Sequence, residues 1–361
     1  MIAPLDWGLG HASRCIPVIE ELLSQGADIL IGTSGRSLQL LRCHFPNLKY
    51  AEFPAYDVRY SHKPSQIPII LRQVPRLLSV IRKEHRLTEN LINKYQIQKI
   101  ISDNRYGVWS RDVPSAFMCH QMAPMLPRVL GLIQPLIYKM HLYTMRHFDE
   151  IWIPDSGKED HLSGDLAHRF ELPKKAQFIG PLSRFSSHVR ERNEYSFPEL
   201  NRQSPDIAVV LSGPEPQRSI LEEMIFQQAK DIDRSIWIVG GKTETKSCSR
   251  DGHIWKISFM DTDDLSLLFQ QSKVIISRSG YSSLMDYQAL GLKQVILIPT
   301  PGQTEQEILG KVLAQKGIAY VADQKRFQLR EALERVGEKQ GFSEGTSNHF
   351  FQDQLGGFLG R

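Results

Sequence analysis

The sequence predicts an α/β protein of two doubly wound, Rossmann-like domains, and three observations support this. The chain has 361 residues, enough for two domains of ordinary size. Short apolar runs alternate with helical patterns along most of it, which is typical of parallel sheets covered by helices on both faces. The alternation is interrupted once, between residues 184 and 205, by a polar and charged stretch that contains Pro198 and Pro205.

We therefore expect four parts along the chain. They are an N-terminal domain at residues 1–183, a linker at 184–205, a C-terminal domain at 206–340, and a tail at 341–361 that either frays or docks back as a short helix. Ligands of doubly wound sheets bind outside the carboxyl ends of the strands, so the two domains are expected to face a central cleft.

Strands are expected where four or five mostly apolar residues, rich in Ile and Val, follow one another. In the N-terminal half they fall at residues 2–5, 28–31, 98–102, 115–118, 150–153 and 176–179. In the C-terminal half they fall at residues 207–211, 236–239, 254–257, 274–277 and 295–298. Helices are expected at residues 13–25, 37–44, 218–230, 264–271, 281–290 and 305–316, three of which end at a glycine.

Composition and charge argue against several classes of protein. Hydrophobic residues make up 41% of the chain and charged residues 23%, as in ordinary globular proteins. The net charge of +4 does not indicate a nucleic-acid partner. Four isolated cysteines, the lack of a basic leader and the lack of an apolar run of 18 residues favour a reduced, cytoplasmic setting. We expect neither a disulfide framework nor a transmembrane helix.

A strand, a tight turn and a helix follow one another over residues 274–290, the most informative stretch of the chain. A helix N-terminus carries unpaired N–H groups and the positive end of the helix dipole, so it favours phosphate. Asp286 lies one turn deeper on the same face, roughly 6 Å along the axis, where it can bind ribose hydroxyls. This spacing indicates a sugar-nucleotide site, and the alternative is an ordinary strand-turn-helix unit. The residues at the opening are Ser279, Gly280, Tyr281, Ser282 and Ser283.

A second candidate site follows the first strand, in the segment Asp6-Trp-Gly-Leu-Gly-His-Ala-Ser-Arg14. Gly8 and Gly10 permit a tight turn with close backbone approach. Serine occupies the position of the third glycine of a dinucleotide fingerprint, and no acidic residue ends the second strand, so an NAD site is not expected. His11 could act as general base on an acceptor hydroxyl, or its ring could cap the loop or pack.

Two polar residues follow other N-terminal strands. Asp103, after the strand at 98–102, could orient His11 and stabilise its protonated form. It could equally cap the next turn, which is the commoner use of aspartate. His120 follows the strand at 115–118 and is a second candidate base.

Two loops complete the candidates in the C-terminal half. After the strand at 207–211 the chain reads Ser-Gly-Pro-Glu-Pro-Gln-Arg, and Arg218 could reach a phosphate beside Gly213, unless the prolines simply make a rigid turn. In the segment 299–307, Thr304 and Glu307 fit a capping box. The polar residues left to hydrogen-bond sugar hydroxyls there are Gln303, Glu305 and Gln306.

Residues 67–87 and 126–147 mix Arg and Lys, among them Arg128, with large apolar side chains. Such a stretch is ordinarily a core-facing helix with a solvated basic side, which is the interpretation we favour. It can also lie on an anionic membrane surface, so peripheral contact with the inner face of a membrane stays an alternative.

Four motifs together resemble those of the GT-B glycosyltransferases, most closely the family-28 group: the Gly-Leu-Gly-His loop ending at His11, the Ser-Arg-Ser-Gly turn ending at Gly280, Asp286, and the Pro-Gly-Gln-Thr-Glu-Gln segment ending at Gln306. This group includes the N-acetylglucosaminyltransferase that makes lipid II in peptidoglycan synthesis and many uncharacterised bacterial relatives. The resemblance covers both domains and is strongest at residues 5–14 and 207–320.

The resemblance implies inverting transfer from a nucleotide-diphospho-sugar, UDP-linked by default, without a cofactor or a bound metal. The N-terminal domain would hold a hydroxyl acceptor, lipid-linked or from the cell envelope, with His11 as the base. The C-terminal domain would hold the donor, with Asp286 on the ribose where the family usually has Glu. Residues of the opening would line the diphosphate, with Gly213 and Arg218 at the donor loop, Tyr281 narrowing the pocket or stacking on the base, and Glu305 and Gln306 facing the sugar.

Physical reasoning agrees with a reaction that needs no metal. Helix N–H groups, hydroxyls and an arginine can stabilise the charge that develops on a leaving diphosphate, in place of a cation. Two alternatives stay open on the same scaffold: a sugar-nucleotide epimerase, which would need further acid and base groups near the donor sugar, and a non-catalytic sugar-nucleotide-binding protein, which would have no use for His11.

Overall fold

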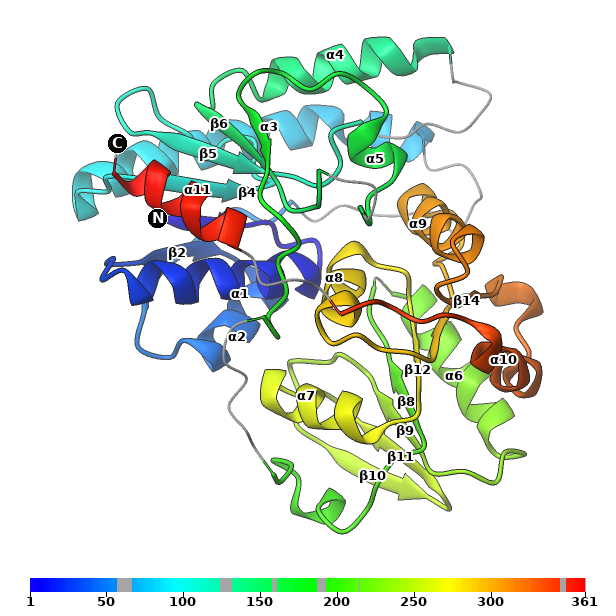
Figure 1. The fold of residues 1–361 in the computed structure, drawn as a ribbon. Helices are drawn as coiled ribbons and strands as arrows, with labels where there is room; N and C mark the ends of the chain where they lie inside the picture. Colours follow the sequence, from blue (N-terminus) through cyan, green and yellow to red (C-terminus); the bar gives the residue numbers. More distant parts are fainter. Residues whose placement is uncertain are drawn as a thin grey trace. The chain divides into compact units, whose positions relative to one another are not determined.

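The computed structural model describes residues 1–56, 67–123, 132–157, 161–186, 193–213, 215–344 and 349–360. The chain divides into two compact units, the first made of residues 1–183 with 347–361 and the second of residues 184–346. The stretch at 184–205 that we interpreted as a linker belongs to the second unit, and its residues 187–192 lie outside the described ranges. Each unit is an α/β layer structure built on one sheet (Figure 1).

Seven parallel strands form the sheet of the first unit, in the order β3-β2-β1-β4-β5-β6-β7. Their bounds are β1 Ile2–Pro4, β2 Leu30–Thr33, β3 Lys49–Glu52, β4 Ile100–Asp103, β5 Ser115–Met118, β6 Glu150–Ile153 and β7 Ala176–Phe178. The chain begins in the middle of the sheet, winds outward to β3, and returns to β4 beside β1. The topological switch point therefore lies between β1 and β4, where Pro4 pairs with Asp103.

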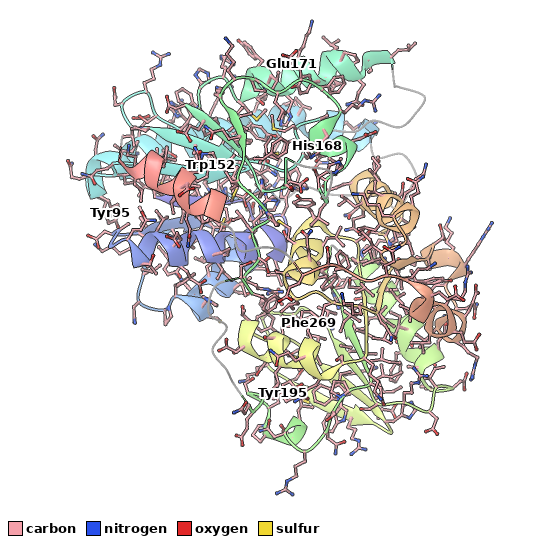
Figure 2. The ribbon with its side chains drawn as sticks, viewed as in Figure 1. Tyr95, Trp152, His168, Glu171, Tyr195 and Phe269 are labelled. Carbon is pink, nitrogen blue, oxygen red and sulfur yellow. The ribbon has the colours of Figure 1, made fainter. Side chains whose placement is uncertain are left out.

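Helices cover this sheet, and the end of the chain supplies one of them. The helices of the first unit are α1 Leu9–Ser24, α2 Gly35–His44, α3 Ile67–Tyr95, α4 Gln134–Thr144, α5 Asp165–His168 and α11 His349–Leu359. In α11, the Phe358 ring packs edge-on against Trp152 of β6 at 5.2 Å between ring centroids, and the Gln352 side chain donates to Glu21 of α1 at 3.2 Å (Figure 2 labels Trp152). Helix α11 is thus packed into the first unit and contributes Phe358 to its core.

The second unit repeats the plan with the order β10-β11-β9-β8-β12-β13-β14. Its strands are β8 Ile207–Val210, β9 Ile236–Val239, β10 Cys248–Asp251, β11 Ile254–Ile257, β12 Val274–Ser277, β13 Val295–Leu297 and β14 Tyr320–Val321. Its helices are α6 Gln217–Ala229, α7 Thr262–Gln271, α8 Tyr281–Ala289, α9 Thr304–Gln315 and α10 Leu329–Arg335, with 3-10 turns η2 Pro198–Leu200, η3 Gln324–Arg326 and η4 Val336–Glu338. The switch point of this sheet lies between β8 and β12.

The expected α/β class with two doubly wound sheets is confirmed, with one antiparallel pair added. The strands β10 and β11 are antiparallel because only two residues join them, with Gly252 at φ +61°, and such a short connection makes a hairpin. Five expected strands, β5, β6, β9, β11 and β12, have the predicted bounds. The three strands that we did not predict, β3, β10 and β14, each lie at a sheet edge. None of the helices in the described ranges is long and apolar enough to cross a membrane.

Candidate functional site

His11 and Asp103 meet at the switch point of the first unit. Asp103 ends β4 and is fully buried, and its Oδ2 lies 3.1 Å from Nδ1 of His11. His11 lies in the first turn of α1, which begins at Leu9 and not at residue 13 as we expected. Gly8 makes this early start possible, because it adopts φ +138° as the N-cap residue, a conformation that strongly favours glycine. His11 keeps 16% of its side chain exposed, so a ligand can reach it.

Arg14 completes this cluster, and our sequence interpretation missed it. Its Nε lies 3.1 and 3.0 Å from the two carboxylate oxygens of Asp103, and its Nη2 also donates to Oδ1. Its Nη1 lies 2.9 Å from Nδ1 of His120, so the second candidate base joins the cluster through Arg14. The signal in the sequence was the three-residue spacing of His11 and Arg14, which places both side chains on one face of a helix.

The charges of this cluster favour a neutral imidazole beside an ionised carboxylate. Burial opposes ionisation of Asp103, but Arg14 and His11 hold the pKa of Asp103 well below its usual range. Burial lowers the pKa of His11, Asp103 offsets part of this effect, and Arg14 adds to the lowering. At neutral pH the ring therefore has an unprotonated nitrogen that can accept a proton. Nδ1 lies between Asp103 and Nη2 of Arg14, which is 2.9 Å away.

A cavity of about 650 Å³ in the first unit is lined by chain neighbours of this cluster. The carboxyl ends of β1, β4 and β5 contribute Leu5, Asn104 and Cys119 to its wall, and Asn104 directly follows Asp103 in the chain. Trp7 and Tyr56 also line it, with their rings edge to face at 6.1 Å. The remaining wall comes mostly from apolar side chains of α3 and α4. This volume is within the range of cavities that bind small organic molecules.

The helices that line the cavity also expose large apolar side chains. On α4, Leu136 is 58% exposed and Tyr143 is 64% exposed, and Leu78 of α3 is also exposed. Arg72 and Arg76 are solvent-exposed on α3, as our favoured interpretation of a solvated basic side requires. That interpretation does not account for the exposed apolar side chains of the same two helices. The part of the second basic stretch at residues 126–131, with Arg128, lies outside the described residues.

The N-terminus of α8 is open in the second unit. Gly280 is its N-cap residue, at φ −74° and ψ 138°, and no side chain caps the helix. A Cβ added to Gly280 would meet no atom within 4 Å in the described part of the chain, so the space beside its Cα is open. Ser282 and Ser283 are half-buried in the first turn, whereas Tyr281 is buried. This is the arrangement that an anion site at a helix N-terminus requires.

Ser279 was expected to line a diphosphate, but its hydroxyl is used within the protein. Its side chain is fully buried and its hydroxyl donates to the backbone oxygen of Gln306 at 2.8 Å, so it joins the turn before α8 to the first turn of α9. Gln306 itself accepts from the N–H of Thr300 at 2.8 Å and donates to the side chain of Gln303 at 2.6 Å. These contacts shape the loop after β13. Glu305 is half-buried in the first turn of α9.

The capping box that we predicted at Thr304 and Glu307 does not form. The N-cap residue of α9 is Gln303, one residue earlier, and it makes no side-chain cap. Glu307 instead accepts from the N–H of Gly302 at 3.0 Å, which closes the turn before the helix. The prediction was wrong because the helix begins at Thr304, so the hydroxyl lies inside the helix and not before it.

Arg218 is committed to other protein groups. It is buried, and its guanidinium donates to Glu215 and Glu222 at 2.8 Å each and to the backbone oxygen of Gly240 at 3.2 Å. A contact with phosphate would require these ion pairs to break. Gly213, earlier in the same loop, adopts φ +103°, and a Cβ there would lie 3.9 Å from Oγ1 of Thr300. That buried hydroxyl has no hydrogen-bond partner in the part of the chain that the structure describes.

Two arginines that we did not consider from the sequence lie at the same edge of the second unit. Arg184 donates from Nε to Oδ2 of Asp286 at 3.2 Å, so the carboxylate expected to bind ribose already has a cationic partner. Arg278 is buried, and its partners among the described residues are neutral oxygens, those of Gln217, Ile298, Pro299 and Gln324. Burial lowers the pKa of Arg278 to about 10, so the side chain stays charged at neutral pH, next to Ser279.

Comparison with known proteins agrees with this architecture. Residues 210–353 match the family model of the glycosyltransferase family 28 C-terminal domain. An uncharacterised glycosyltransferase of Methanosarcina acetivorans is 24% identical over 337 residues, which cover 86% of this chain and 80% of the relative. An uncharacterised glycosyltransferase of Methanosarcina mazei is 23% identical over 336 residues, covering 86% and 82%.

Solved structures with the same fold include glycosyltransferases of several kinds. CalG4, the calicheamicin glycosyltransferase, superposes with a TM-score of 0.63 over 100% of this chain and 98% of its own, at 13% identity. MurG of Acinetobacter baumannii has a TM-score of 0.55 over 100% and 98%, at 12% identity. LpCGTa, solved in complex with UDP, has a TM-score of 0.59 over 99% and 98%, at 14% identity. At these identities the likeness shows the fold alone. The family model over residues 210–353, the glycosyltransferase relatives and the two doubly wound units together support a glycosyltransferase of the family-28-like type with the GT-B fold.

Proposed function

We propose that this glycosyltransferase moves a sugar from a nucleotide-diphospho-sugar, most simply a UDP-sugar, to a hydroxyl group of an apolar or lipid-linked acceptor, with inversion and without a bound metal. The observation that carries the proposal is the pair of His11 and the buried, ionised Asp103 at the switch point of the first unit. A protein that only binds sugar nucleotides has no need of such a pair.

In the proposed reaction His11 removes the proton of the acceptor hydroxyl. In the reacting tautomer Nδ1–H of the ring donates to Oδ2 of Asp103 and Nη2 of Arg14 donates to Oδ1, so that Nε2 has the free lone pair. The acceptor oxygen bonds to the anomeric carbon of the donor while the bond from that carbon to the β-phosphate oxygen breaks, and its electrons leave with the diphosphate. Asp103 then stabilises the imidazolium that forms. A single displacement of this kind inverts the anomeric carbon.

Three features of the second unit support a leaving diphosphate at α8. No side chain caps the helix at Gly280, and the space beside the Cα of Gly280 is open. The buried Arg278 adds a positive charge that no carboxylate among the described residues neutralises. Arg184 can turn from Asp286 toward the phosphate when ribose hydroxyls take its place on that carboxylate. These groups supply positive potential that a divalent cation supplies in other transferases.

The cavity of the first unit supports an acceptor with a large apolar part. Its walls are mostly apolar, and two of its polar members, Asn104 and Gln121, follow the carboxyl ends of β4 and β5. The two helices that line the cavity also carry exposed side chains. These are Leu136 and Tyr143 on α4 and arginines on α3. This combination favours peripheral contact with an anionic membrane, from which an amphiphilic acceptor could enter the cavity.

A panel of nucleotide sugars tests the donor first. The true donor should raise the melting temperature, because it binds the folded state only. The best donor is then incubated with hydroxyl-bearing amphiphiles, and the anomeric configuration of the product is read by NMR coupling constants. We expect inversion and a rate that does not depend on added Mg²⁺ or Mn²⁺. Retention of configuration, an absolute need for Mg²⁺, or a panel without any stabilising nucleotide sugar would each contradict the proposal.

A further inference from the structure

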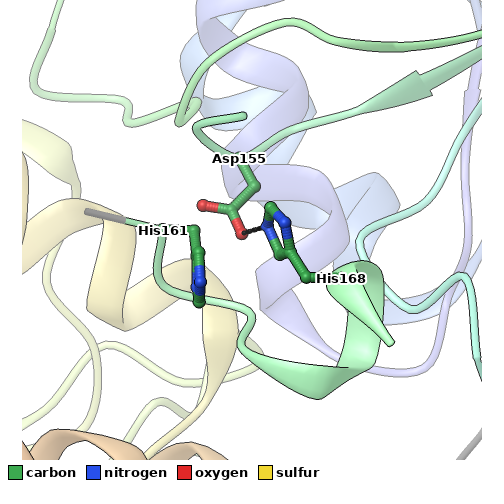
Figure 3. A group of neighbouring side chains, drawn as sticks. All are labelled: Asp155, His161 and His168. Atoms are coloured by element: carbon green, nitrogen blue, oxygen red, sulfur yellow. Dashed lines mark ion pairs between the residues drawn. The ribbon is translucent and has the colours of Figure 1, made fainter. Parts of the chain in front are cut away.

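Three metal-ligating side chains stand together outside the site described above. Asp155 follows β6, His161 lies six residues later, and His168 ends α5. One ligand atom from each lies within 4.8 Å of the others, and Figure 3 shows the three side chains facing one another. The group lies in the connection between β6 and β7 and shares no residue with the sites described above.

We propose that Asp155, His161 and His168 bind a divalent transition-metal ion, and Zn²⁺ in preference to Mg²⁺ or Ca²⁺. Imidazole nitrogens suit Zn²⁺, whereas Mg²⁺ and Ca²⁺ require oxygen ligands. Three protein ligands leave a fourth tetrahedral position for water. The proposal does not depend on the transfer reaction, and the site has no part in that mechanism.

The carboxylate of Asp155 is held in one orientation by the loop around it. It is 1% exposed. Its Oδ1 accepts the N–H groups of Ser156 and Leu162 at 2.8 and 2.9 Å, and its Oδ2 accepts the N–H and the hydroxyl of Ser163. Such outer contacts orient a carboxylate ligand before the metal arrives. The hydroxyl of Ser163 can rotate away, which leaves a lone pair of Oδ2 for the metal.

His168 is placed as a ligand next to this carboxylate. Its Nε2 is buried, makes no hydrogen bond within the described part of the chain, and lies 3.6 Å from Oδ2 of Asp155. That separation is too long for a good hydrogen bond. It is close to the ~3.4 Å between two ligand atoms that each lie ~2.1 Å from a tetrahedral Zn²⁺. The ring is fixed by stacking on Phe178 at 4.8 Å between centroids.

His161 is the third ligand and needs the largest adjustment. Its ring stacks on that of His168 at 4.0 Å, and its Nδ1 accepts the N–H of Gly164 at 3.2 Å. To bind the metal it must turn and give up this long hydrogen bond. We therefore expect His161 to contribute less to the metal affinity than His168.

The test uses the full chain, freed of metal by dialysis against a chelator and then titrated with Zn²⁺ by calorimetry. Co²⁺ serves as a second probe, because its visible absorption reports tetrahedral coordination by nitrogen. We expect one ion per chain. His168→Ala should weaken Zn²⁺ binding more than tenfold, His161→Ala should weaken it by a smaller factor, and Ser163→Ala should preserve it.

His44→Ala is the matched control, since His44 also faces a carboxylate, that of Glu20 at 3.2 Å, but has no third ligand among the described residues. Its Zn²⁺ affinity should equal that of the wild type. His168 is 22% exposed, so its alanine variant is expected to fold, and its melting curve without metal verifies this. The proposal is overturned if the wild type binds no Zn²⁺ at micromolar concentration, or if folded His168→Ala binds it as tightly as the wild type.

Discussion

The substitution Gly280→Ala should weaken donor binding while leaving the stability of the fold nearly unchanged. The backbone at Gly280, φ −74° and ψ 138°, is ordinary for alanine, and the added Cβ would have no neighbour within 4 Å. Alanine is a poorer N-cap than glycine, but it also reduces the freedom of the unfolded chain, which contributes about 0.4–1 kcal/mol in the opposite direction. The free energy of unfolding should therefore change by less than about 1 kcal/mol.

The same methyl group would occupy the space in which we place the diphosphate. If it displaces the phosphate from one helical N–H, one hydrogen bond to a charged group is lost, which costs about 1.5–3 kcal/mol. This energy corresponds to a roughly 10- to 100-fold increase in the Kd of the donor nucleotide. Because the substitution leaves the fold intact, the loss should appear in binding and not in the melting temperature of the free protein.

Calorimetric titration with UDP, or with the nucleotide of the best stabilising sugar nucleotide, measures this Kd. Gly356→Ala is the matched control, because Gly356 of α11 also has no atom within 4 Å of an added Cβ and belongs to the first unit. A Kd of Gly280→Ala equal to that of wild type and control would refute the placement of the diphosphate in front of α8.

Three other outcomes test the remaining parts of the account. Asp103→Asn leaves Arg14 buried without its carboxylate, so it should destabilise the protein by about 3–5 kcal/mol in urea denaturation. In the fraction that stays folded, the acid limb of the pH–rate profile should move to lower pH. An unmoved limb would count against the pair of His11 and Asp103. Burial lowers the pKa of His11 and of His141, so the unfolded state binds protons first, and the contribution of these two rings to the free energy of unfolding should fall as the pH drops below about 6.5. The fall over that range should be less steep in His141→Gln, and an equal slope in that variant would remove His141 as a source. Replacing the exposed Leu136 and Tyr143 by Ser should reduce sedimentation with anionic vesicles several-fold and leave the melting temperature within about 2 °C, whereas unchanged sedimentation would rule out α4 as a membrane contact.

The central strands and the candidate loops could be predicted from the sequence, because both follow from local patterns. Strands β5, β6, β9 and β12 are buried at every position, and β11 at every position but Lys256, so they appear as mostly apolar runs. The edge strands are different. In β3 the outer residues Lys49 and Glu52 are exposed, and β10 is mostly exposed, so neither has the apolar pattern that predicts a strand.

The arginines of the candidate sites could not be predicted, because their partners are distant in the sequence. Arg14 and Asp103 are 89 residues apart, and Arg184 and Asp286 are 102 residues apart. Periodicity indicates which face of a helix is buried, but it does not identify the group that the face meets. The same limit explains Ser279, whose hydroxyl binds a backbone oxygen of α9, a helix that begins 25 residues later.

Turnover and donor binding by His11→Ala, measured side by side, test the central claim most directly. Removing the base should lower kcat by roughly 10²- to 10⁴-fold. The Kd of the donor nucleotide should stay within about twofold of the wild type, because His11 belongs to the first unit and the proposed donor groups to the second. A variant that turns over as fast as the wild type would show that another group accepts the proton, and the mechanism built on His11 and Asp103 would fail.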